Sequence, residues 1–247
     1  MDIRPFIDST YLKTASQAAL DENQNQAVVE TFIREAIDER FKLIMIRPEM
    51  VALAKKIVSE SESNVQIGTV IDFPQGQSGI EKKLQEANQA IVDGADELDF
   101  VCNYEAFKND EVDLVKEEIL KGTRLTLDNN KIIKWIIEVA ALTDKQIIQL
   151  SALIKNVVMA NFKEGDYASV FVKSSTGFYQ TANNESNGAT ISSVIMMMEN
   201  ASPLSVKAAG GVRTYEDAVE MIKLGVKRIG TSAAKAIVNG ERNQDKY

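Results

Sequence analysis

The sequence predicts a single α/β domain, a (β/α)8 (TIM) barrel over residues 1–240 followed by a polar tail at 241–247. Short runs rich in β-forming residues alternate with longer segments whose apolar residues recur every three or four positions, as in βα units around a parallel sheet. Eight such units in 247 residues match the barrel. No linker or shift in composition marks a domain boundary. An open doubly wound sheet is the alternative, disfavoured because no Gly-x-Gly-x-x-Gly turn follows the first strands.

Eight apolar runs provide the expected strands, and longer periodic segments provide the helices between them. The strands are expected at residues 6–8, 43–46, 65–71, 97–101, 132–139, 169–173, 204–208 and 228–230. The expected helices include residues 49–59, 81–93, 144–159, 192–199 and 215–224. Gly94 and Gly225 each follow a helical pattern and precede a strand, which is the position of a glycine that ends a helix.

Composition and charge exclude several classes of function. A net charge of −8 and a pI near 4.9 disfavour nucleic acid and anionic membranes, because both need a basic face. No apolar run approaches the roughly 18 residues of a membrane span, and the N-terminus lacks a signal-peptide core. Cys102 is the only cysteine, so we expect a cytoplasmic protein without a disulfide or cysteine metal centre. The chain has no histidine, so other groups must move protons.

Two lysines at the ends of apolar strands are the leading candidates for catalysis. Lys173 ends a run that begins at Ala168, and Lys207 ends a run that begins at Pro203. An ordinary lysine, with a pKa of ~10.4, is only about a thousandth neutral near pH 7.4. Burial and a neighbouring cation lower that pKa and make the amine a nucleophile. Either lysine alone is better explained by a structural ion pair or a snorkelling side chain, but the two together at strand ends favour carbonyl chemistry.

Charged residues on the inward faces of the strands predict an ionic cluster inside the barrel. Side chains two positions apart share a strand face, so Glu97 lies on the same side as Asp99. Buried charges are costly unless they are paired. Asp99 is expected either to move protons for an amine or to serve as a counter-ion for the lysines. Lys134 and Glu138 are expected to form a supporting, mainly structural pair.

The loops after the seventh and eighth strands predict an anion site. The run from Gly210 and Gly211 to Arg213 lacks the spacing of a Walker loop, but two glycines before a helix can aim backbone N–H groups at a phosphate. The run from Gly230 to Ser232 follows the last strand in the same way. In barrels these two loops often hold a phosphate. Glycine turns with helix caps are the structural alternative.

Six motifs occur in order along nearly the whole chain: Ile7-Asp-Ser-Thr-Tyr-Leu12; Phe73-Pro-Gln-Gly76; Glu97-Leu-Asp-Phe-Val101 with Asn103; Phe171-Val-Lys-Ser-Ser-Thr-Gly-Phe178; Val206-Lys-Ala-Ala-Gly-Gly-Val-Arg213; and Gly230-Thr-Ser232. Together they resemble the 2-deoxyribose-5-phosphate aldolase family, and the two motifs that contain Lys173 and Lys207 are highly specific.

The resemblance implies a class I aldolase that needs neither a metal nor an organic cofactor. It implies reversible cleavage of 2-deoxy-D-ribose 5-phosphate to D-glyceraldehyde 3-phosphate and acetaldehyde. Lys173 would form the Schiff base, Lys207 would depress its pKa, and Asp99 would work with bound water in proton transfer. Asp8 would lie near the pocket, and a homodimer is implied. The residues expected around the phosphate are Gly177, Gly210, Gly211, Arg213, Gly230 and Ser232.

Three positions depart from the family. Many relatives carry histidine where Ser9 stands and cysteine where Met45 stands, and some carry a small polar residue where Ala233 stands. The departures at Ser9 and Met45 bear only on pocket shape and aldehyde sensitivity, because the amine mechanism requires neither position. The departure at Ala233 predicts a looser hold on phosphate rather than a different reaction. Tyr247 is a hypothetical proton donor folded over the pocket. The rival functions are another lysine-dependent sugar-phosphate aldolase or transaldolase, and a catalytically silent sugar-phosphate-binding barrel.

Overall fold

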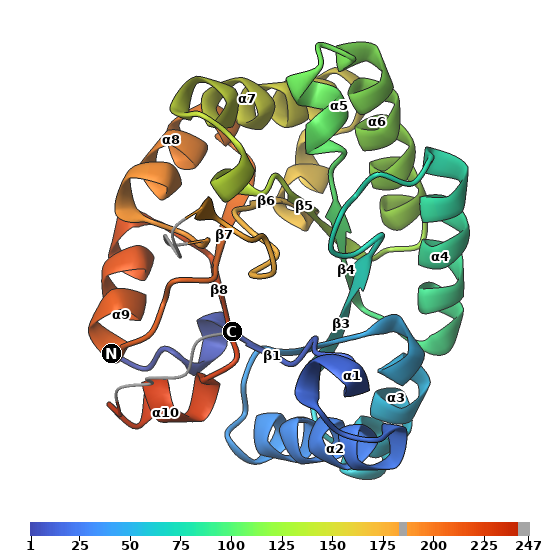
Figure 1. Cartoon of the computed structure of the whole chain (residues 1–247), viewed down its shortest axis with the longest axis vertical. Helices are drawn as coiled ribbons and strands as arrows, with labels where there is room; N and C mark the ends of the chain where they lie inside the picture. The colour runs from blue at the N-terminus through green and yellow to red at the C-terminus, as the bar shows by residue number, and fades with distance from the viewer. Residues whose placement is uncertain (183–186, 242–247) are drawn as a thin grey trace.

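The computed structural model, which describes residues 1–182 and 187–241, contains the closed parallel barrel that the sequence predicts (Figure 1). The strands follow one another in chain order, and β8 closes the barrel by pairing with β1. They are β1 (Ile7–Thr10), β2 (Leu43–Ile46), β3 (Gln66–Ile71), β4 (Glu97–Val101), β5 (Ile132–Ile136), β6 (Val170–Lys173), β7 (Ser205–Ala209) and β8 (Arg228–Thr231). The predicted bounds agree to within two residues for every strand except the fifth.

The fifth strand ends earlier than its sequence predicts. The apolar run continues to Val139, but the strand stops at Ile136. Glu138 adopts a left-handed backbone conformation with φ 56°, which an extended strand does not contain. The chain then makes a 3-10 turn at Val139–Ala141 before the next helix.

The helices form a ring outside the barrel (Figure 1). They are α1 (Ala15–Ala18), α2 (Glu22–Asp38), α3 (Val51–Glu60), α4 (Ile80–Asp93), α5 (Tyr104–Lys108), α6 (Val112–Asp128), α7 (Asp144–Asn161), α8 (Ile191–Ala201), α9 (Tyr215–Leu224) and α10 (Ala234–Val238). Of the long helices, α2 and α6 were not among the expected segments. Gly94 and Gly225 end α4 and α9 in the left-handed conformation, as the sequence predicts.

Alternation along the strands separates an outer core from the interior of the barrel. Val170 and Val172 of β6 pack in the apolar core between strands and helices, whereas Lys173 is on the opposite strand face. Trp135 of β5 also faces the helices and is fully buried. A Cβ atom on Gly122 of α6 would approach its ring to 2.9 Å, so only glycine lets this helix pack so closely.

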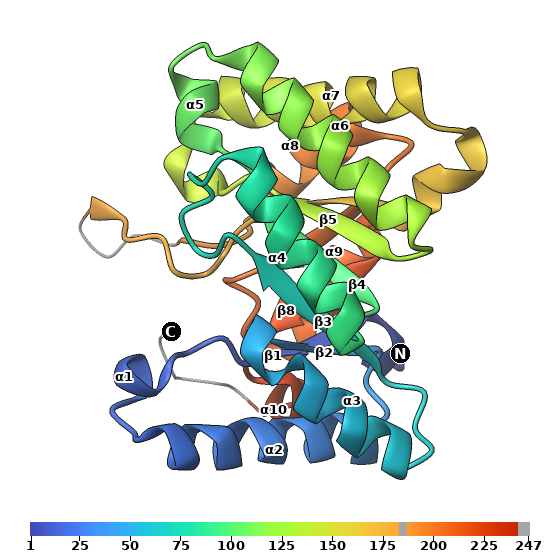
Figure 2. The ribbon, with the colours of Figure 1, turned by 90° about the vertical axis from the view of Figure 1, so that its right-hand side faces the viewer.

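The connection after β6, drawn in orange, projects from the side of the molecule where α1 and α5 lie (Figure 2). Because this connection leaves the carboxyl end of β6, the carboxyl ends of the parallel strands open on that side. At the end of the chain, Glu241 donates its backbone N–H to Ala236 O at 2.8 Å. The predicted tail residues 242–247, with Tyr247, lie outside the described residues. Within the described ranges, no helix is long and apolar enough to cross a membrane.

Candidate active site

Strand register brings the predicted charged residues to one level of the barrel interior. Lys173 of β6 is paired in register with Lys207 of β7, and Asp99 of β4 with Lys134 of β5. Each of these residues is 2% exposed or less. Since parallel neighbours in register point to the same face of a sheet, the four groups meet inside the barrel.

One carboxylate joins the three lysines. Asp99 Oδ2 lies 2.9 Å from Lys173 Nζ and 3.0 Å from Lys207 Nζ, so both amines share a single oxygen. Asp99 Oδ1 lies 2.7 Å from Lys134 Nζ. Lys134 thus contacts the carboxylate that joins the other two lysines, and it pairs with Asp99 and Glu97 rather than with Glu138.

A second group of charges continues this cluster across the barrel. Asp8 Oδ2 of β1 lies 2.6 Å from Lys207 Nζ, and Glu97 Oε2 lies 2.6 Å from Lys134 Nζ. Arg228 of β8 joins the two carboxylates, at 3.1 Å from Asp8 Oδ1 and 2.7 Å from Glu97 Oε1. The sequence analysis did not name Arg228 as a site residue. Its place two residues before Gly230 on an inward strand face is the signal that could have found it.

The interior ionic cluster, as we call Asp8, Glu97, Asp99, Lys134, Lys173, Lys207 and Arg228, has four cations against three carboxylates. One positive charge is in excess when every group is ionised. Excess charge in a buried site is costly. Release of one proton balances the cluster, and Lys173 lies at the carboxyl end of its strand, where a substrate can approach.

Burial lowers the pKa of Lys173 to about 8, with the Asp99 carboxylate opposing the change and the Lys207 cation adding to it. For the carboxyl group of Asp99, the neighbouring charges outweigh the effect of burial on the pKa. Burial alone raises the pKa of its carboxyl group, but the adjacent Lys134, Lys173 and Lys207 cations hold that pKa well below its usual range. Burial likewise lowers the pKa of Lys134, yet the surrounding Asp99, Glu97 and Asp8 raise it above the ordinary value. Lys173 is thus the group poised to lose a proton near neutral pH.

Glu138 does not form the ion pair with Lys134 that the sequence suggested. Its carboxylate turns to the loop after β6, where Glu138 Oε2 accepts hydrogen bonds from the backbone N–H of Thr176, at 3.1 Å, and from Thr176 Oγ1. The left-handed backbone at Glu138 redirects the side chain away from the strand alternation on which the prediction depended.

The predicted phosphate glycines lie in two loops that contact each other. Gly177, Gly210 and Gly211 all have positive φ, between 71° and 82°, which suits glycine. Asn187 Nδ2 donates to Gly177 O at 3.0 Å, and the neighbouring Gly188 packs so closely on Gly210 that a Cβ atom would overlap its backbone. The loops after β6 and β7 therefore lie against each other.

The remaining predicted phosphate residues have other surroundings. Gly230 lies within β8, and a Cβ atom there would come 3.0 Å from Lys207 Cε, so this glycine makes room for the lysine side chain. Arg213 is exposed, and its backbone N–H donates to Asp217 at the start of α9. Ser232 and Ala233 line a hollow between α2 and α10. Arg213 belongs to the loop after β7, two residues beyond Gly211, and Gly230 pairs in register with Ala209, next to Gly210, whereas Ser232 and Ala233 lie at a separate hollow.

Aromatic side chains cover part of the barrel's carboxyl end. Phe73, after β3, packs edge-to-face on Phe178, after β6, with ring centroids 5.1 Å apart. Both rings cover an interior apolar patch that includes Met45 and Val70. Arg47 stacks on Phe73 at 5.0 Å. The mouth therefore has an apolar side near β2 and β3, whereas the lysines lie on β5, β6 and β7.

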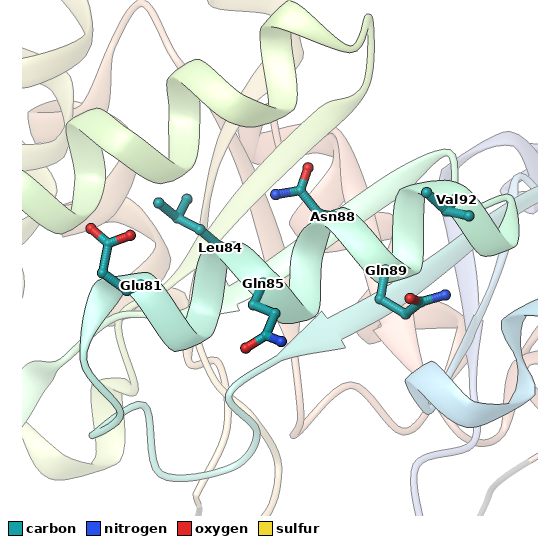
Figure 3. A pocket seen from close by; sticks show the side chains of 6 residues that line it. All are labelled: Glu81, Leu84, Gln85, Asn88, Gln89 and Val92. Atoms are coloured by element: carbon teal, nitrogen blue, oxygen red, sulfur yellow. The ribbon is translucent and has the colours of Figure 1, made fainter.

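A shallow hollow on the outside of the barrel does not belong to this site. Its lining residues all come from α4, and Figure 3 shows them along this one helix. They are Glu81, Leu84, Gln85, Asn88, Gln89 and Val92. None of them belongs to the interior ionic cluster.

Comparison with known proteins finds relatives over the whole length of the chain. The family described as DeoC/LacD family aldolase matches residues 7–240. The chain is 38% identical to a deoxyribose-phosphate aldolase of Thermococcus gammatolerans, over 99% of each protein, and 36% identical to one of Streptococcus suis, over 100% of each. It is similar to the solved structure of the aldolase QR15, with 30% identity, a TM-score of 0.80 and coverage of 97% of this chain and 95% of that one. It is also similar to the tetrameric deoxyribose phosphate aldolase of Aeropyrum pernix, with 27% identity, a TM-score of 0.76 and coverage of 96% and 89%.

Proposed function

Because the chain belongs to the DeoC/LacD family of aldolases, we propose that it cleaves 2-deoxy-D-ribose 5-phosphate reversibly to D-glyceraldehyde 3-phosphate and acetaldehyde through an imine on Lys173. The observation that carries this proposal is the buried Lys173 amine, whose pKa of about 8 is set by burial. About a fifth of such an amine is neutral near pH 7.4, against about a thousandth of an ordinary lysine. The neutral form is the nucleophile.

In the cleavage direction, the Lys173 amine attacks C1 of the open-chain sugar, and loss of water gives a protonated imine. A proton leaves the C3 hydroxyl, the C2–C3 bond breaks, and the imine nitrogen accepts the electron pair. D-Glyceraldehyde 3-phosphate departs and an enamine remains on Lys173. Protonation of the enamine carbon and hydrolysis then release acetaldehyde. The iminium ion is the electron sink, so the proposed reaction uses no metal or organic cofactor.

Asp99 and Lys207 are the proposed proton-transfer groups. Asp99 Oδ2 contacts both amines, so a proton can pass between Lys173 and Lys207 through one oxygen. Since the pKa of Asp99 lies well below its usual range, the carboxylate holds a proton only in passing. Its negative charge also stabilises the iminium cation. Lys134 and Asp8 hold Asp99 and Lys207 in place through the contacts at 2.7 and 2.6 Å.

The phosphate is proposed to bind at the two glycine loops. Backbone N–H groups near Gly177, Gly210 and Gly211 supply donors, and Arg213, two residues beyond Gly211, supplies a cation. These contacts orient the sugar and do not break the bond. Gly230 and Ser232 complete the proposed set; in the structure Gly230 also makes room for the Lys207 side chain, and Ser232 lines a separate hollow.

Two further properties belong to the proposal. We propose a cytoplasmic protein, because its single cysteine, Cys102, is buried and unpaired. We also propose a homodimer, which light scattering would detect as twice the chain mass of 27.3 kDa. A mass of four chains would instead match the assembly named for the Aeropyrum pernix relative.

Borohydride trapping tests the function directly. The protein is treated with acetaldehyde and borohydride, and its peptides are mapped by mass, with the exposed Lys145 as the measure of background labelling. We expect a stoichiometric adduct on Lys173 that K173M abolishes and K145M retains. An unlabelled Lys173 would refute the imine. Acceptance of dihydroxyacetone-type donors in place of acetaldehyde would favour the rival aldolase or transaldolase, and binding of sugar phosphate without turnover would favour the silent barrel.

A further inference from the structure

Glu138 is a buried carboxylate outside the interior ionic cluster, and the proposed reaction gives it no task. Its side chain is at the carboxyl end of the barrel, just beyond β5, and the residue is 1% exposed. Both hydrogen bonds to Glu138 Oε2 come from uncharged groups of Thr176. Glu138 Oε1 has no hydrogen-bond partner among the described residues. A buried carboxylate with so few partners is costly to keep.

The backbone at Glu138 adds to this cost. A side chain other than glycine or asparagine is uncommon at φ 56°, and strained conformations of this kind cluster at functional sites. Burial raises the pKa of Glu138 to about 7, with the Thr176 hydrogen bonds and the Lys173 charge opposing the change. Strain, burial and an unpartnered oxygen all oppose stability, so they point to a functional role for Glu138.

Thr176 links Glu138 to the mouth of the site through hydrogen bonds. Thr176 Oγ1 donates to Glu138 and also accepts a hydrogen bond from the backbone N–H of Phe178 at 3.0 Å. Residues 176–179, here called the β6 loop segment, include Gly177 of the proposed phosphate site and Phe178, which packs on Phe73. The segment begins three residues after Lys173. Glu138 thus holds the stretch of backbone between the nucleophile and the phosphate loop.

We propose that Glu138 is a positioning residue: by accepting both hydrogen bonds from Thr176, it fixes the β6 loop segment so that a phosphorylated sugar lies correctly against Lys173. This inference rests on the proposed aldolase function. Glu138 takes no part in forming the imine. Its loss therefore impairs turnover of the sugar phosphate while leaving the Lys173 amine able to react with acetaldehyde.

Two titratable neighbours face Glu138 and bear on its protonation. The Lys173 cation, on β6, favours the carboxylate form. Tyr104, on α5, has a pKa raised to about 12 by burial and by the Glu138 charge, so it stays neutral throughout the range in which Glu138 titrates. A substitution that removes the Glu138 carboxyl group should therefore remove one ionisation near pH 7 from the pH profile of turnover.

The test compares E138A, E138Q, T176V and the double variant E138A/T176V with the full-length wild-type protein. The measured quantities are kcat and KM for 2-deoxy-D-ribose 5-phosphate over pH 5.5–8.5, and trapping of acetaldehyde on Lys173 with borohydride. T123V is the matched control, because Thr123 is a buried threonine whose hydroxyl accepts from Trp135 Nε1 at 3.0 Å on the opposite face of β5.

We expect E138A and T176V each to lower kcat/KM by about 10- to 100-fold, the effect of a misplaced substrate. The double variant should lose less activity than the product of the two single effects, because both single variants remove the same hydrogen bond from Thr176 Oγ1 to Glu138. E138Q keeps an acceptor oxygen and should retain most of the activity while losing the ionisation near pH 7. T123V should keep wild-type turnover, and all variants should trap acetaldehyde on Lys173.

Equal kcat/KM in E138A and the wild type would overturn the proposal, as would effects of E138A and T176V that multiply in the double variant. Loss of trapping in a folded E138A would show that Glu138 acts on Lys173 itself. If E138A fails to fold, two other results still test the proposal. E138Q should lose the ionisation near pH 7 from the pH profile, and T176S should restore the activity that T176V loses. No adduct on wild-type Lys173 would instead refute the aldolase proposal, whatever the Glu138 variants do.

Discussion

Replacement of Lys207 by methionine should raise the pKa of the Lys173 amine. The two Nζ atoms contact Asp99 Oδ2 at 2.9 and 3.0 Å, so they lie no more than about 6 Å apart. At that distance, with an effective dielectric constant of ~20, two unit charges repel by about 3 kcal/mol. Removal of this repulsion should raise the pKa of Lys173 from about 8 to about 10. Near neutral pH the neutral fraction of the amine should fall by about 100-fold.

The assay is the initial rate of acetaldehyde trapping on Lys173 by borohydride, measured from pH 6.5 to 11. Trapping reports the first nucleophilic step, so it separates the pKa of Lys173 from any later proton transfer by Lys207. The wild-type rate should rise with a midpoint near pH 8. The K207M rate should be low at pH 7 and should approach the wild-type plateau only near pH 10–11.

K134M is the matched control for this experiment. Lys134 is equally buried but contacts the other oxygen of Asp99, and its charge is the smallest of the effects on the pKa of Lys173. Its removal should move the midpoint much less than K207M does. A K207M midpoint that stays at pH 8 would refute the electrostatic reasoning, provided that circular dichroism shows the variant to be folded.

Three other substitutions give independent tests. Because the pKa of Glu138 is raised in the folded protein, from 4.5 to about 7, this residue stabilises the fold below pH 4.5 and that stabilisation is lost as the pH rises through 7. E138Q should therefore abolish a loss of about 3 kcal/mol of unfolding free energy between pH 5 and 8, measured by denaturant titration; the same pH dependence in both proteins would contradict this. K83M should lower the unfolding free energy by about 3–5 kcal/mol, because the fully buried Lys83 pairs with the buried Glu118, and a change below ~1 kcal/mol would show that the pair is dispensable. G230A places a methyl group 3.0 Å from Lys207 Cε, so kcat should fall with the fold intact at a cost of about 1–3 kcal/mol; wild-type kcat would mean that Lys207 moves aside freely.

The order of strands and helices could be predicted because it depends on local pattern. β-Rich runs placed seven strands within two residues, and helical periodicity ending at Gly225 placed α9 at Tyr215–Leu224. The helices α2 and α6 were missed for local reasons as well. The first turns of α2 are almost entirely polar, and α6 contains Gly122, which is there because Trp135 leaves no room for a Cβ atom.

The two candidate lysines could also be found from the sequence, because a strand end in a parallel barrel determines which way a side chain faces. Alternation then places Asp99 on the same interior. The sequence could not predict which of these charged side chains pair with one another. Arg228 lies 131 residues from Glu97 and 220 from Asp8, and only closure of the barrel through β8 and β1 brings the three together.

Sequence alone determined that this chain is a barrel with two lysines and a carboxylate facing its interior, because strand periodicity and strand ends are properties of neighbouring residues. Tertiary structure decided what each charge does. The lowered pKa of Lys173 depends on burial and on groups contributed by other strands, and the turn of Glu138 toward Thr176 depends on one left-handed residue. Electrostatic energy depends on distance and burial in space, which separation along the chain does not give.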